Sequence, residues 1–208
     1  YQFVPRNKEL IIMIGFQGSG KTNFVKNNIL PHDYIYVNMD ECKTKAKCLK
    51  ITEEAMNEKK SIVIDDSYNA SPFSVMAALN VLARFPNQIK IAALGDMLEL
   101  GDDTEKGHKE VGELVASLNL TKLVTVGELG KKIADAAQAA GMAKEDIYSF
   151  VNSDVAKTEV LKMLEPESVI LVKGSQGARM EKISKELLAE PSSAVQFLPR
   201  QYGKWLES

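Results

Sequence analysis

The chain has 208 residues, of which 45% are hydrophobic and 26% are charged, and both values are ordinary for a globular protein. This length is enough for one large α/β domain or for two small ones. Acidic residues outnumber basic ones by 28 to 26, giving a formal net charge of −2. The balance does not favour a protein that binds duplex nucleic acid, since such proteins usually carry a basic surplus.

No apolar run approaches the length of a membrane span, and the first ten residues lack the layout of a secretion signal. Cys42 and Cys48 are six residues apart, a spacing that fits neither a metal site nor a redox motif. We therefore expect reduced thiols, a cytoplasmic location and no membrane partner. The sequence gives no indication of the oligomeric state.

The first third of the chain alternates short apolar runs with helical segments. ELIIMI at 9–14 predicts a buried strand, because it lies between a charged residue and a glycine. A helix is expected from about Lys21 to Ile29, ended by Pro31. A second strand is predicted at 34–39, a helix at 43–60 and a third strand at 61–65.

The same alternation continues to the end. Pro72 suits a first helical turn and begins a helix that runs to about Leu82. Further strands are predicted at 89–94, 122–127, 147–150 and 168–174, with 195–198 as one more candidate, and further helices at 106–118, 128–140, 154–164 and 180–189. Strands that alternate with helices of about ten residues predict a mostly parallel sheet with helices on both faces. The expected fold is a single three-layer α/β/α domain over 1–208.

A glycine-rich segment follows the first predicted strand. GFQGSGKT at 15–22 matches G-x-x-x-x-G-K-[ST], with a buried strand before it and a helix after it. Glycines allow successive backbone amides to converge on one anion, and the helix adds the positive end of its dipole. The candidate phosphate-binding residues are Gly15, Gln17, Gly18, Ser19, Gly20, Lys21 and Thr22.

Two of the candidate side chains have specific roles in this prediction. The Lys21 ammonium is expected to reach the β- and γ-phosphates, and the Thr22 hydroxyl to ligate Mg²⁺. A magnesium site of this kind also needs a carboxylate at the end of a neighbouring strand, and Asp65 is placed for that role. The alternative is that Asp65 only ends a strand in solvent. The expected ligands are ATP or ADP and Mg²⁺.

Residues 8–65 resemble the kinase domain of the polynucleotide 5′-kinases. The resemblance rests on KELIIMIGFQGSGKTNFVKNNI, then YIYVNMDE, then a lysine-rich helix and IVIDD. It implies that Asp40 is the general base acting on a 5′-hydroxyl group. Asp40 could equally cap a helix, a common role for aspartate after a strand, and the two roles are compatible.

Residues 62–190 resemble the C-terminal domain of the Mur ligases, in particular those that add D-alanyl-D-alanine to a UDP-muramoyl tripeptide. The resemblance rests on IDDSYNASPFSVMAAL, IAALGDMLELGDDTEKGHKEVGEL and ILVKGSQGARME. It implies a Rossmann-like sheet that closes over ATP held by a separate central domain and helps to place the incoming amino acid or dipeptide.

We interpret the chain as a recombined, designed chimera of a P-loop kinase-like fragment (1–65) and a Mur ligase-like fragment (66–190), with an extra segment at 191–208; a natural fusion is the alternative. The expected function is nucleotide binding with little or no turnover. The kinase resemblance ends before the arginine-bearing lid, and the sequence has no arginine between Arg84 and Arg179. Without the other Mur domains, peptide ligation is not expected.

Two further functions remain as alternatives. One is an active kinase of the polynucleotide type, and only in that case is nucleic acid expected as a partner. The other is a structural chimera that binds phosphate, sulfate or nothing.

Several polar residues of the Mur-like part have two interpretations each. Tyr68 could pack on a nucleobase and Asn69 could bind ribose or phosphate, but both could simply form the turn before the Pro72 helix. His108 has no partner for a triad or a metal site in the sequence, so we expect a surface histidine. Lys173 could offer a positive charge to a phosphate or lie in solvent as a loop lysine.

Overall fold

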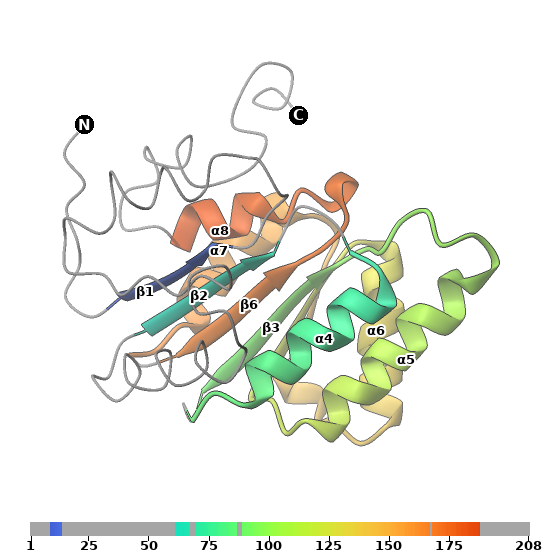
Figure 1. Cartoon of the computed structure of the whole chain (residues 1–208), viewed down its shortest axis with the longest axis horizontal. Coiled ribbons are helices and arrows are strands. Elements are labelled where there is room, and N and C mark those ends of the chain that lie inside the picture. Colours follow the sequence, from blue (N-terminus) through green and yellow to red (C-terminus); the bar gives the residue numbers. More distant parts are fainter. Residues whose placement is uncertain (1–8, 14–60, 67–69, 87–88, 167, 188–208) are drawn as a thin grey trace, which may run out of the picture.

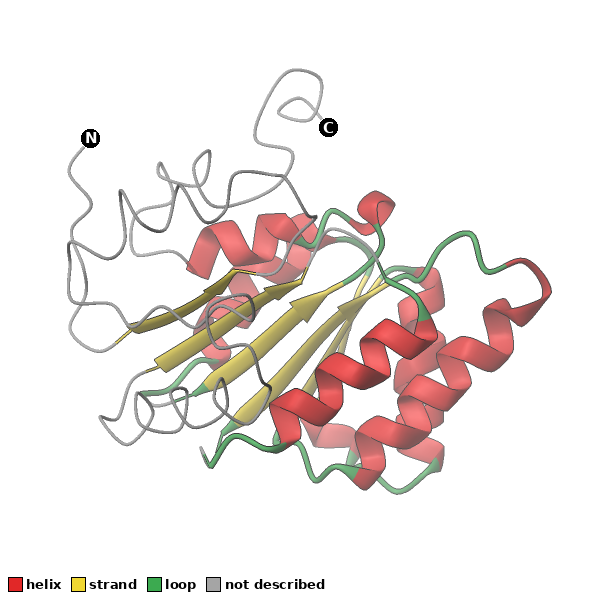
Figure 2. Cartoon of the chain, viewed as in Figure 1, coloured by secondary structure: helices red, strands yellow, loops and turns green. Residues whose placement is uncertain are grey.

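A computed structural model shows an α/β protein built on one parallel sheet (Figure 1). The structure describes residues 9–13, 61–66, 70–86, 89–166 and 168–187, and it describes the first two of these segments by their backbone alone. Figure 2 shows the strands as a central layer with helices in front of it and behind it. The three-layer arrangement predicted from the alternation of elements is confirmed for this part of the chain.

The described residues contribute six strands to the sheet, in the order β1-β2-β6-β3-β4-β5, and all neighbouring pairs among them are parallel. The strands are β1 (Glu9–Met13), β2 (Ser61–Asp66), β3 (Lys90–Gly95), β4 (Lys122–Val126), β5 (Ile147–Phe150) and β6 (Val169–Lys173). Every residue of β6 is buried, as expected for a central strand covered on both faces.

In the described part of the chain, five α-helices cover the two faces of the sheet. They are α4 (Pro72–Ala83), α5 (Thr104–Ser117), α6 (Glu128–Ala139), α7 (Ser153–Met163) and α8 (Glu181–Leu187). Helices α4, α5 and α6 share one hydrophobic cluster with one side of the sheet, while α7 and α8 share a second cluster with the other side. Short 3₁₀ turns lie at Gly101–Asp103, Lys144–Asp146 and Gln176–Ala178.

The alternation of side chains along β3 explains how one strand contributes residues to both hydrophobic clusters. Ala92 and Leu94 belong to the cluster under α4 and α5, whereas Ile91 and Ala93 belong to the cluster under α7 and α8. Successive side chains of a strand point to opposite faces, so a continuous apolar run supplies two cores. This is why the buried strands could be recognised as short apolar runs.

Helix α4 begins where the sequence predicts it. The Ser71 side chain accepts a hydrogen bond from the Ser74 amide at 3.3 Å, and the Ser74 side chain accepts one from the Ser71 amide at 3.0 Å. Pro72 occupies the first helical position, where its missing N–H costs no hydrogen bond. This reciprocal capping fixes the first turn of the helix.

The predicted bounds of the other described elements agree with the structure to within about three residues at either end. Helix α5 begins two residues earlier than expected, because the 3₁₀ turn at Gly101–Asp103 leads directly into it. The predicted helices at 21–29 and 43–60, the predicted strands at 34–39 and 195–198, and the Walker-type loop lie outside the described residues. None of the helices within the described ranges is long and apolar enough to cross a membrane.

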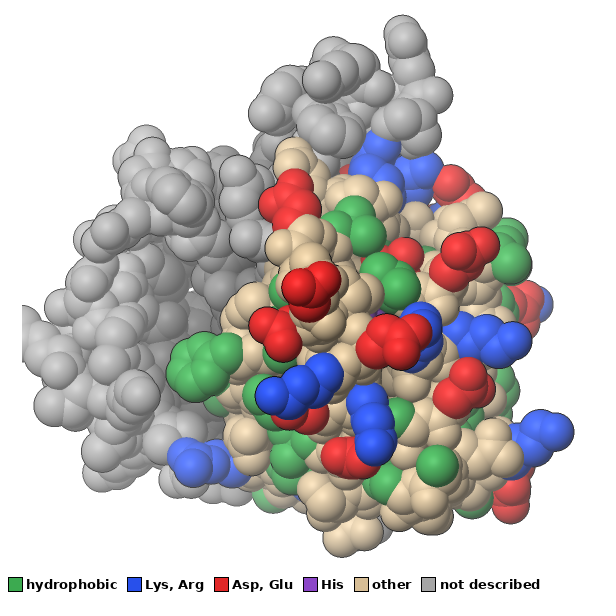
Figure 3. Space-filling view, turned by 90° about the vertical axis from the view of Figure 1, so that its right-hand side faces the viewer, with side chains coloured by type: hydrophobic (Ala, Val, Ile, Leu, Met, Phe, Trp, Pro, Cys, Tyr) green, Lys and Arg blue, Asp and Glu red, His purple; other side chains and the backbone are tan. Residues whose placement is uncertain are grey.

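Charges of both signs mix on the side of the molecule where α5 and α6 lie (Figure 3). On α5 the ammonium groups of Lys106 and Lys109 lie 3.9 and 3.6 Å from Glu110 and Glu113, one helical turn later. Exposed pairs of this kind contribute little to stability, about 0.3–0.5 kcal/mol each. Because acidic and basic side chains are interspersed, the face shown has no continuous basic surface. This agrees with the formal net charge of −2.

Candidate functional site

The carboxyl ends of all six strands lie along one edge of the sheet, since the strands are parallel. Open parallel sheets bind ligands outside this edge, at the point where neighbouring strands continue to helices on opposite faces. Strand β3 continues to α5 on one face, and its neighbour β6 continues to α8 on the other. One such switch point therefore lies between β3 and β6.

Strand β1, which precedes the predicted phosphate loop in the sequence, ends at the same edge of the sheet. Strand β1 ends at Met13, which is in register with Asp65 of β2. Strand β1 thus ends at the edge where β2 ends in Asp65 and Asp66. The predicted ligands Gly15, Gln17, Gly18, Ser19, Gly20, Lys21, Thr22, Tyr68 and Asn69, and the predicted base Asp40, lie outside the described residues.

The loops after β3 and β6 approach each other very closely. A Cβ atom on Gly174 would lie 3.1 Å from the Cα of Gly95, and one on Gly95 would lie 2.7 Å from the Cβ of Ala178. The 2.7 Å contact is too short for a side chain and the 3.1 Å contact is tight, so glycine fits best at the end of β3 and directly after β6. The close approach brings the two loops together at the switch point.

Ser175 joins three loops at this edge. Its side-chain oxygen accepts a hydrogen bond from the Leu98 amide at 2.8 Å and donates one to the Ala70 carbonyl at 3.4 Å. Its own amide donates to the Asp96 carbonyl at 2.9 Å. Ser175 is only 4% exposed. The segments following β2, β3 and β6 are therefore held together by one residue.

The prediction that His108 is a surface histidine is wrong. Its side chain is completely buried, and its Nε2 accepts a hydrogen bond from the Met97 amide at 3.1 Å. The other ring nitrogen, Nδ1, lies 2.6 Å from the Thr104 carbonyl. A carbonyl can only accept, so the proton is on Nδ1 and the ring is neutral. His108 thus holds the loop after β3 against α5.

The structure excludes one of the two interpretations of Lys173, that of a loop lysine in solvent. Lys173 is the last residue of β6 and is 2% exposed. Its neighbours in register are Asp66 of β2 and Leu94 of β3. A buried ammonium group is unfavourable unless it has polar partners.

Asp96 connects the same loop to α6. Its Oδ1 accepts a hydrogen bond from the Gly130 amide at 2.7 Å, in the first turn of that helix. Gly127, directly before the helix, has a φ of 96° and lies against the Asp96 carboxylate. A carboxylate at a helix N-terminus satisfies a free amide and interacts favourably with the helix dipole. Glu99 follows in the left-handed region with a φ of 63°.

Comparison with known proteins agrees with this architecture. The family model described as Mur ligase, glutamate ligase domain, matches residues 53–176. The chain belongs to this family. The match covers β2 to β6 and thus most of the described sheet. The expectation from the motifs at 62–190 is confirmed at the level of the family.

The curated relatives include complete Mur ligases. The UDP-N-acetylmuramoyl-tripeptide–D-alanyl-D-alanine ligase of Bacillus subtilis is 34% identical over 132 residues, which are 63% of this chain and 29% of that protein. The Escherichia coli enzyme of the same name is 33% identical over 61% of this chain and 26% of that protein. The chain thus matches less than a third of the length of these ligases.

One relative has a different name. A protein of Acanthamoeba polyphaga mimivirus, named as a bifunctional polynucleotide phosphatase/kinase, is 43% identical over 126 residues, which are 61% of this chain and 29% of that protein. The similarity gives a weak indication of a kinase-like segment beside the Mur ligase domain. Neither a P-loop nor a chimeric origin follows from it.

Solved structures support the fold of the Mur ligase domain. A crystal structure of MurF from Acinetobacter baumannii is 26% identical, with a TM-score of 0.54 over 69% of this chain and 34% of that one. MurF ligase from Thermotoga maritima, solved in complex with ADP, has a TM-score of 0.52 at 24% identity over 64% of this chain and 29% of that one. The second likeness shows the fold alone.

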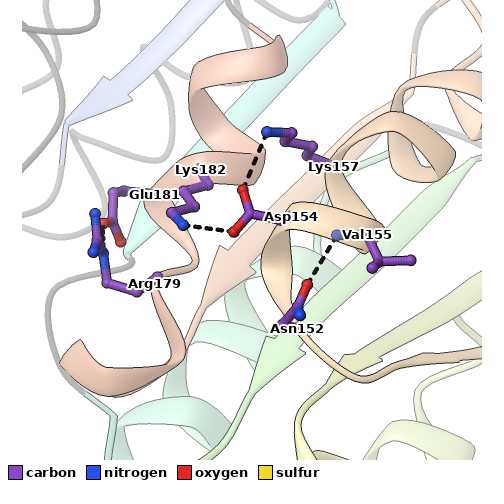
Figure 4. A network of polar contacts seen from close by, with 7 residues as sticks. All are labelled: Asn152, Asp154, Val155, Lys157, Arg179, Glu181 and Lys182. Atoms are coloured by element: carbon purple, nitrogen blue, oxygen red, sulfur yellow. Dashed lines mark hydrogen bonds and ion pairs between the residues drawn. The ribbon is translucent and has the colours of Figure 1, made fainter. Parts of the chain in front are cut away.

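A separate polar network lies on the α7–α8 face of the Mur ligase domain (Figure 4). Asp154 accepts hydrogen bonds from Lys182 at 2.6 Å and from Lys157 at 3.2 Å, which lower the pKa of its carboxyl group. Arg179 Nε donates to Glu181 at 2.6 Å, and the Glu181 side chain is fully buried. These contacts fix the start of α8 beside α7.

Sequence reasoning missed the residues that organise the edge. Ser175 contacts partners that are 77 and 105 positions away, and no spacing in the sequence indicates such contacts. Asp96 accepts a hydrogen bond from an amide of α6 that is 34 positions away, and the sequence gives no sign of that contact either. Within the described part of the chain, no group of three or more His, Cys, Asp or Glu side chains is arranged to hold a metal ion.

Proposed function

We propose that the chain binds the phosphates of ATP or ADP, with Mg²⁺, at the carboxyl edge of its sheet. One observation carries the proposal: β1 runs parallel to β2 with Met13 in register with Asp65. The sequence that follows Met13 after one residue is the G-x-x-x-x-G-K-T segment. A phosphate loop requires a buried strand that ends at this edge, next to a strand that ends in a carboxylate.

The residues fit this role by their chemistry. The amides of Gly15 to Thr22 would surround the phosphates, with Lys21 adding a positive charge. The Thr22 hydroxyl and the Asp65 carboxylate would hold Mg²⁺, which prefers oxygen ligands and neutralises phosphate charge when it is bound. Tyr68 and Asn69 follow β2 at the same edge and would contact the nucleoside, although they also suit the turn before α4.

We expect little or no turnover from this chain by itself. The resemblance to the kinases ends before their arginine-bearing lid, so phosphoryl transfer would lack that arginine. Peptide ligation would need the other Mur domains, because this chain matches only 29% of the length of the Bacillus subtilis ligase. A recombination of kinase-like and Mur ligase-like fragments explains the two resemblances, and a natural fusion is the alternative. A structural chimera that holds only phosphate or sulfate would lack selectivity for nucleotides.

Calorimetry tests the proposal directly. Titration of the parent chain with ADP and Mg²⁺ should give a heat of binding. The same titration of Lys21→Ala should give none, because the mutant loses the positive charge that would face the phosphates. Lys109→Ala is a matched control, since Lys109 is an exposed lysine of α5 that pairs across one helical turn with Glu113. Absence of ADP binding by the parent, or equal binding by both lysine variants, would overturn the proposal.

A second candidate function is favoured by the mimivirus relative, whose name includes a polynucleotide kinase. In this case Asp40 would accept the proton of a 5′-hydroxyl group as it attacks the γ-phosphate, and the products would be ADP and a 5′-phosphorylated polynucleotide. Transfer of labelled phosphate from ATP to an oligonucleotide tests the activity. If it occurs and Asp40→Asn transfers phosphate as fast as the parent, Asp40 is not the base.

A further inference from the structure

The connections between the described strands all turn in the same sense. From β2 to β3, from β3 to β4 and from β4 to β5 the chain moves along the sheet in one direction, and α4, α5 and α6 cross on one face. From β5 to β6 the chain moves back, and α7 crosses on the opposite face. Reversing both the direction and the face keeps the hand of a crossover. These four crossovers therefore share one hand, as is the rule for parallel strands.

The same rule indicates the face on which the chain passes from β1 to β2. Strand β1 is the neighbour of β2 on the side away from β6, so this step runs in the direction of the three crossovers on the α4 face. The last part of the connection is the helix predicted at 43–60, which leads directly into β2. A predicted strand at 34–39, added beyond β1, would not change the result, because the helix would still reach β2 from that side. The segment 43–60 therefore belongs on the α4 face.

Helix α4 has a flank that faces this part of the sheet. Pro72 packs against α5 at Gly107, where an added Cβ would lie 2.5 Å from the proline ring. Val81 lies about two and a half helical turns after Pro72 and thus on the opposite side of α4. Since α5 continues the helical layer toward β4, the Val81 side faces the part of the layer over β2 and β1. The Val81 side chain is 47% exposed.

The composition of α4 is unusual for a helix that faces water on one side. PFSVMAALNVLA, from Pro72 to Ala83, contains no charged residue. Helices α5 and α6, in the same layer, carry charged residues along their exposed sides. A helix that is apolar on more than its core side is normally covered by a further element. The composition of α4 therefore favours a second helical neighbour besides α5.

The predicted helix at 43–60 has an apolar face that suits this position. Its larger apolar residues, with one alanine, recur at spacings of three, four and seven: Cys48, Leu49, Ile51, Ala55 and Met56. Lysine and glutamate occupy most of the other positions. The family match begins at residue 53, so the second part of the segment belongs to the same Mur ligase domain as α4. An amphipathic helix of this domain needs an apolar surface on which to pack.

We propose that the Val81 flank of α4 is the docking surface for the segment 43–60. The contact would bury the apolar side of the segment and leave its lysine and glutamate side chains in water. It would also join the part of the chain that follows the predicted phosphate loop to the Mur ligase domain in one helical layer. The inference does not depend on nucleotide binding, because it follows from the strand order and from the composition of α4.

Distances between spin labels test the face on which the segment lies. In a Cys42→Ser background, Cys48 is the single native cysteine of the chain. The second label is attached either at Asn80→Cys, exposed on α4 beside the flank, or at Lys185→Cys on α8, which packs on β2 from the other face. The distance from Cys48 to position 80 should be the shorter one, because the sheet would separate the segment from α8.

Hydrogen exchange tests the contact itself. Val81→Asp should reduce the protection of the amides in 43–60, because a carboxylate would be buried in the contact without a partner. Leu161→Asp is the matched control, since Leu161 is 44% exposed on α7, on the opposite face of the sheet, and should leave this exchange unchanged. Equal exchange in the two variants, or a label at position 185 as close to Cys48 as the label at position 80, would overturn the inference.

Discussion

The side-chain oxygen of Ser175 accepts a hydrogen bond from the amide of Leu98 at 2.8 Å, although the two residues are 77 positions apart in the sequence. The contact joins the loop after β6 to the loop after β3 at the switch point of the sheet. With the bond to the Ala70 carbonyl, it makes three segments of the carboxyl edge behave as one unit. The shape of the edge therefore depends on a single buried hydroxyl group.

Ser175→Ala should destabilise the protein. The Leu98 amide would lose its acceptor in a site where Ser175 itself is only 4% exposed, and leaving a buried donor without an acceptor costs about 1–3 kcal/mol. Urea unfolding followed by circular dichroism measures the change. Ser117→Ala, at an exposed serine at the end of α5, is the control and should change the free energy of unfolding by less than about 0.5 kcal/mol.

The buried ring of His108 should exist in one neutral form, with its proton on Nδ1, because Nε2 accepts from the Met97 amide. Long-range ¹⁵N–¹H spectra at neutral pH distinguish this form from the other tautomer. His108→Phe should destabilise the protein by about 1–3 kcal/mol, since the Met97 amide would then have no acceptor. A proton found on Nε2 at neutral pH would contradict the assignment.

The sequence predicted the described strands and helices well because each strand of the sheet is a short apolar run and each helix has a clear beginning, such as Ser71-Pro72 at α4. It failed for His108 and for the solvent interpretation of Lys173. Both are polar residues that become buried when several elements pack together, and the order of residues in a single segment carries no information about that packing. The switch point likewise follows only from the strand order.

Helices α5 and α6 should not tolerate a larger residue at Gly112. An added Cβ would collide with the Ile133 carbonyl and lie 2.7 Å from the Cβ of Ala136. Alanine favours a helix over glycine by about 1 kcal/mol, yet we expect Gly112→Ala to lower the free energy of unfolding because overpacking typically costs about 1–3 kcal/mol. Thermal unfolding measures the effect, with Glu113→Ala at the adjacent exposed position as the control.

The contribution of Asp154 should depend on pH. Hydrogen bonds from Lys182 and Lys157 lower the pKa of its carboxyl group below the ordinary value of 3.8. The folded state then favours the ionised form more than the unfolded state does, so stability is gained above the unfolded-state pKa and lost as the pH falls through the lower, folded-state pKa. The carboxylate is half exposed, and such pairs contribute only about 0.2–1 kcal/mol.

The difference in unfolding free energy between the parent and Asp154→Asn should therefore be largest near neutral pH and should shrink as the pH falls below about 4. Asp135→Asn, on the exposed side of α6, is the control for removing one negative charge from a helix. High salt should reduce the difference, because exposed charges are screened. A difference for Asp154→Asn that stays constant from pH 7 to pH 2, or that matches Asp135→Asn throughout, would mean that its carboxylate does not connect α7 to α8 electrostatically.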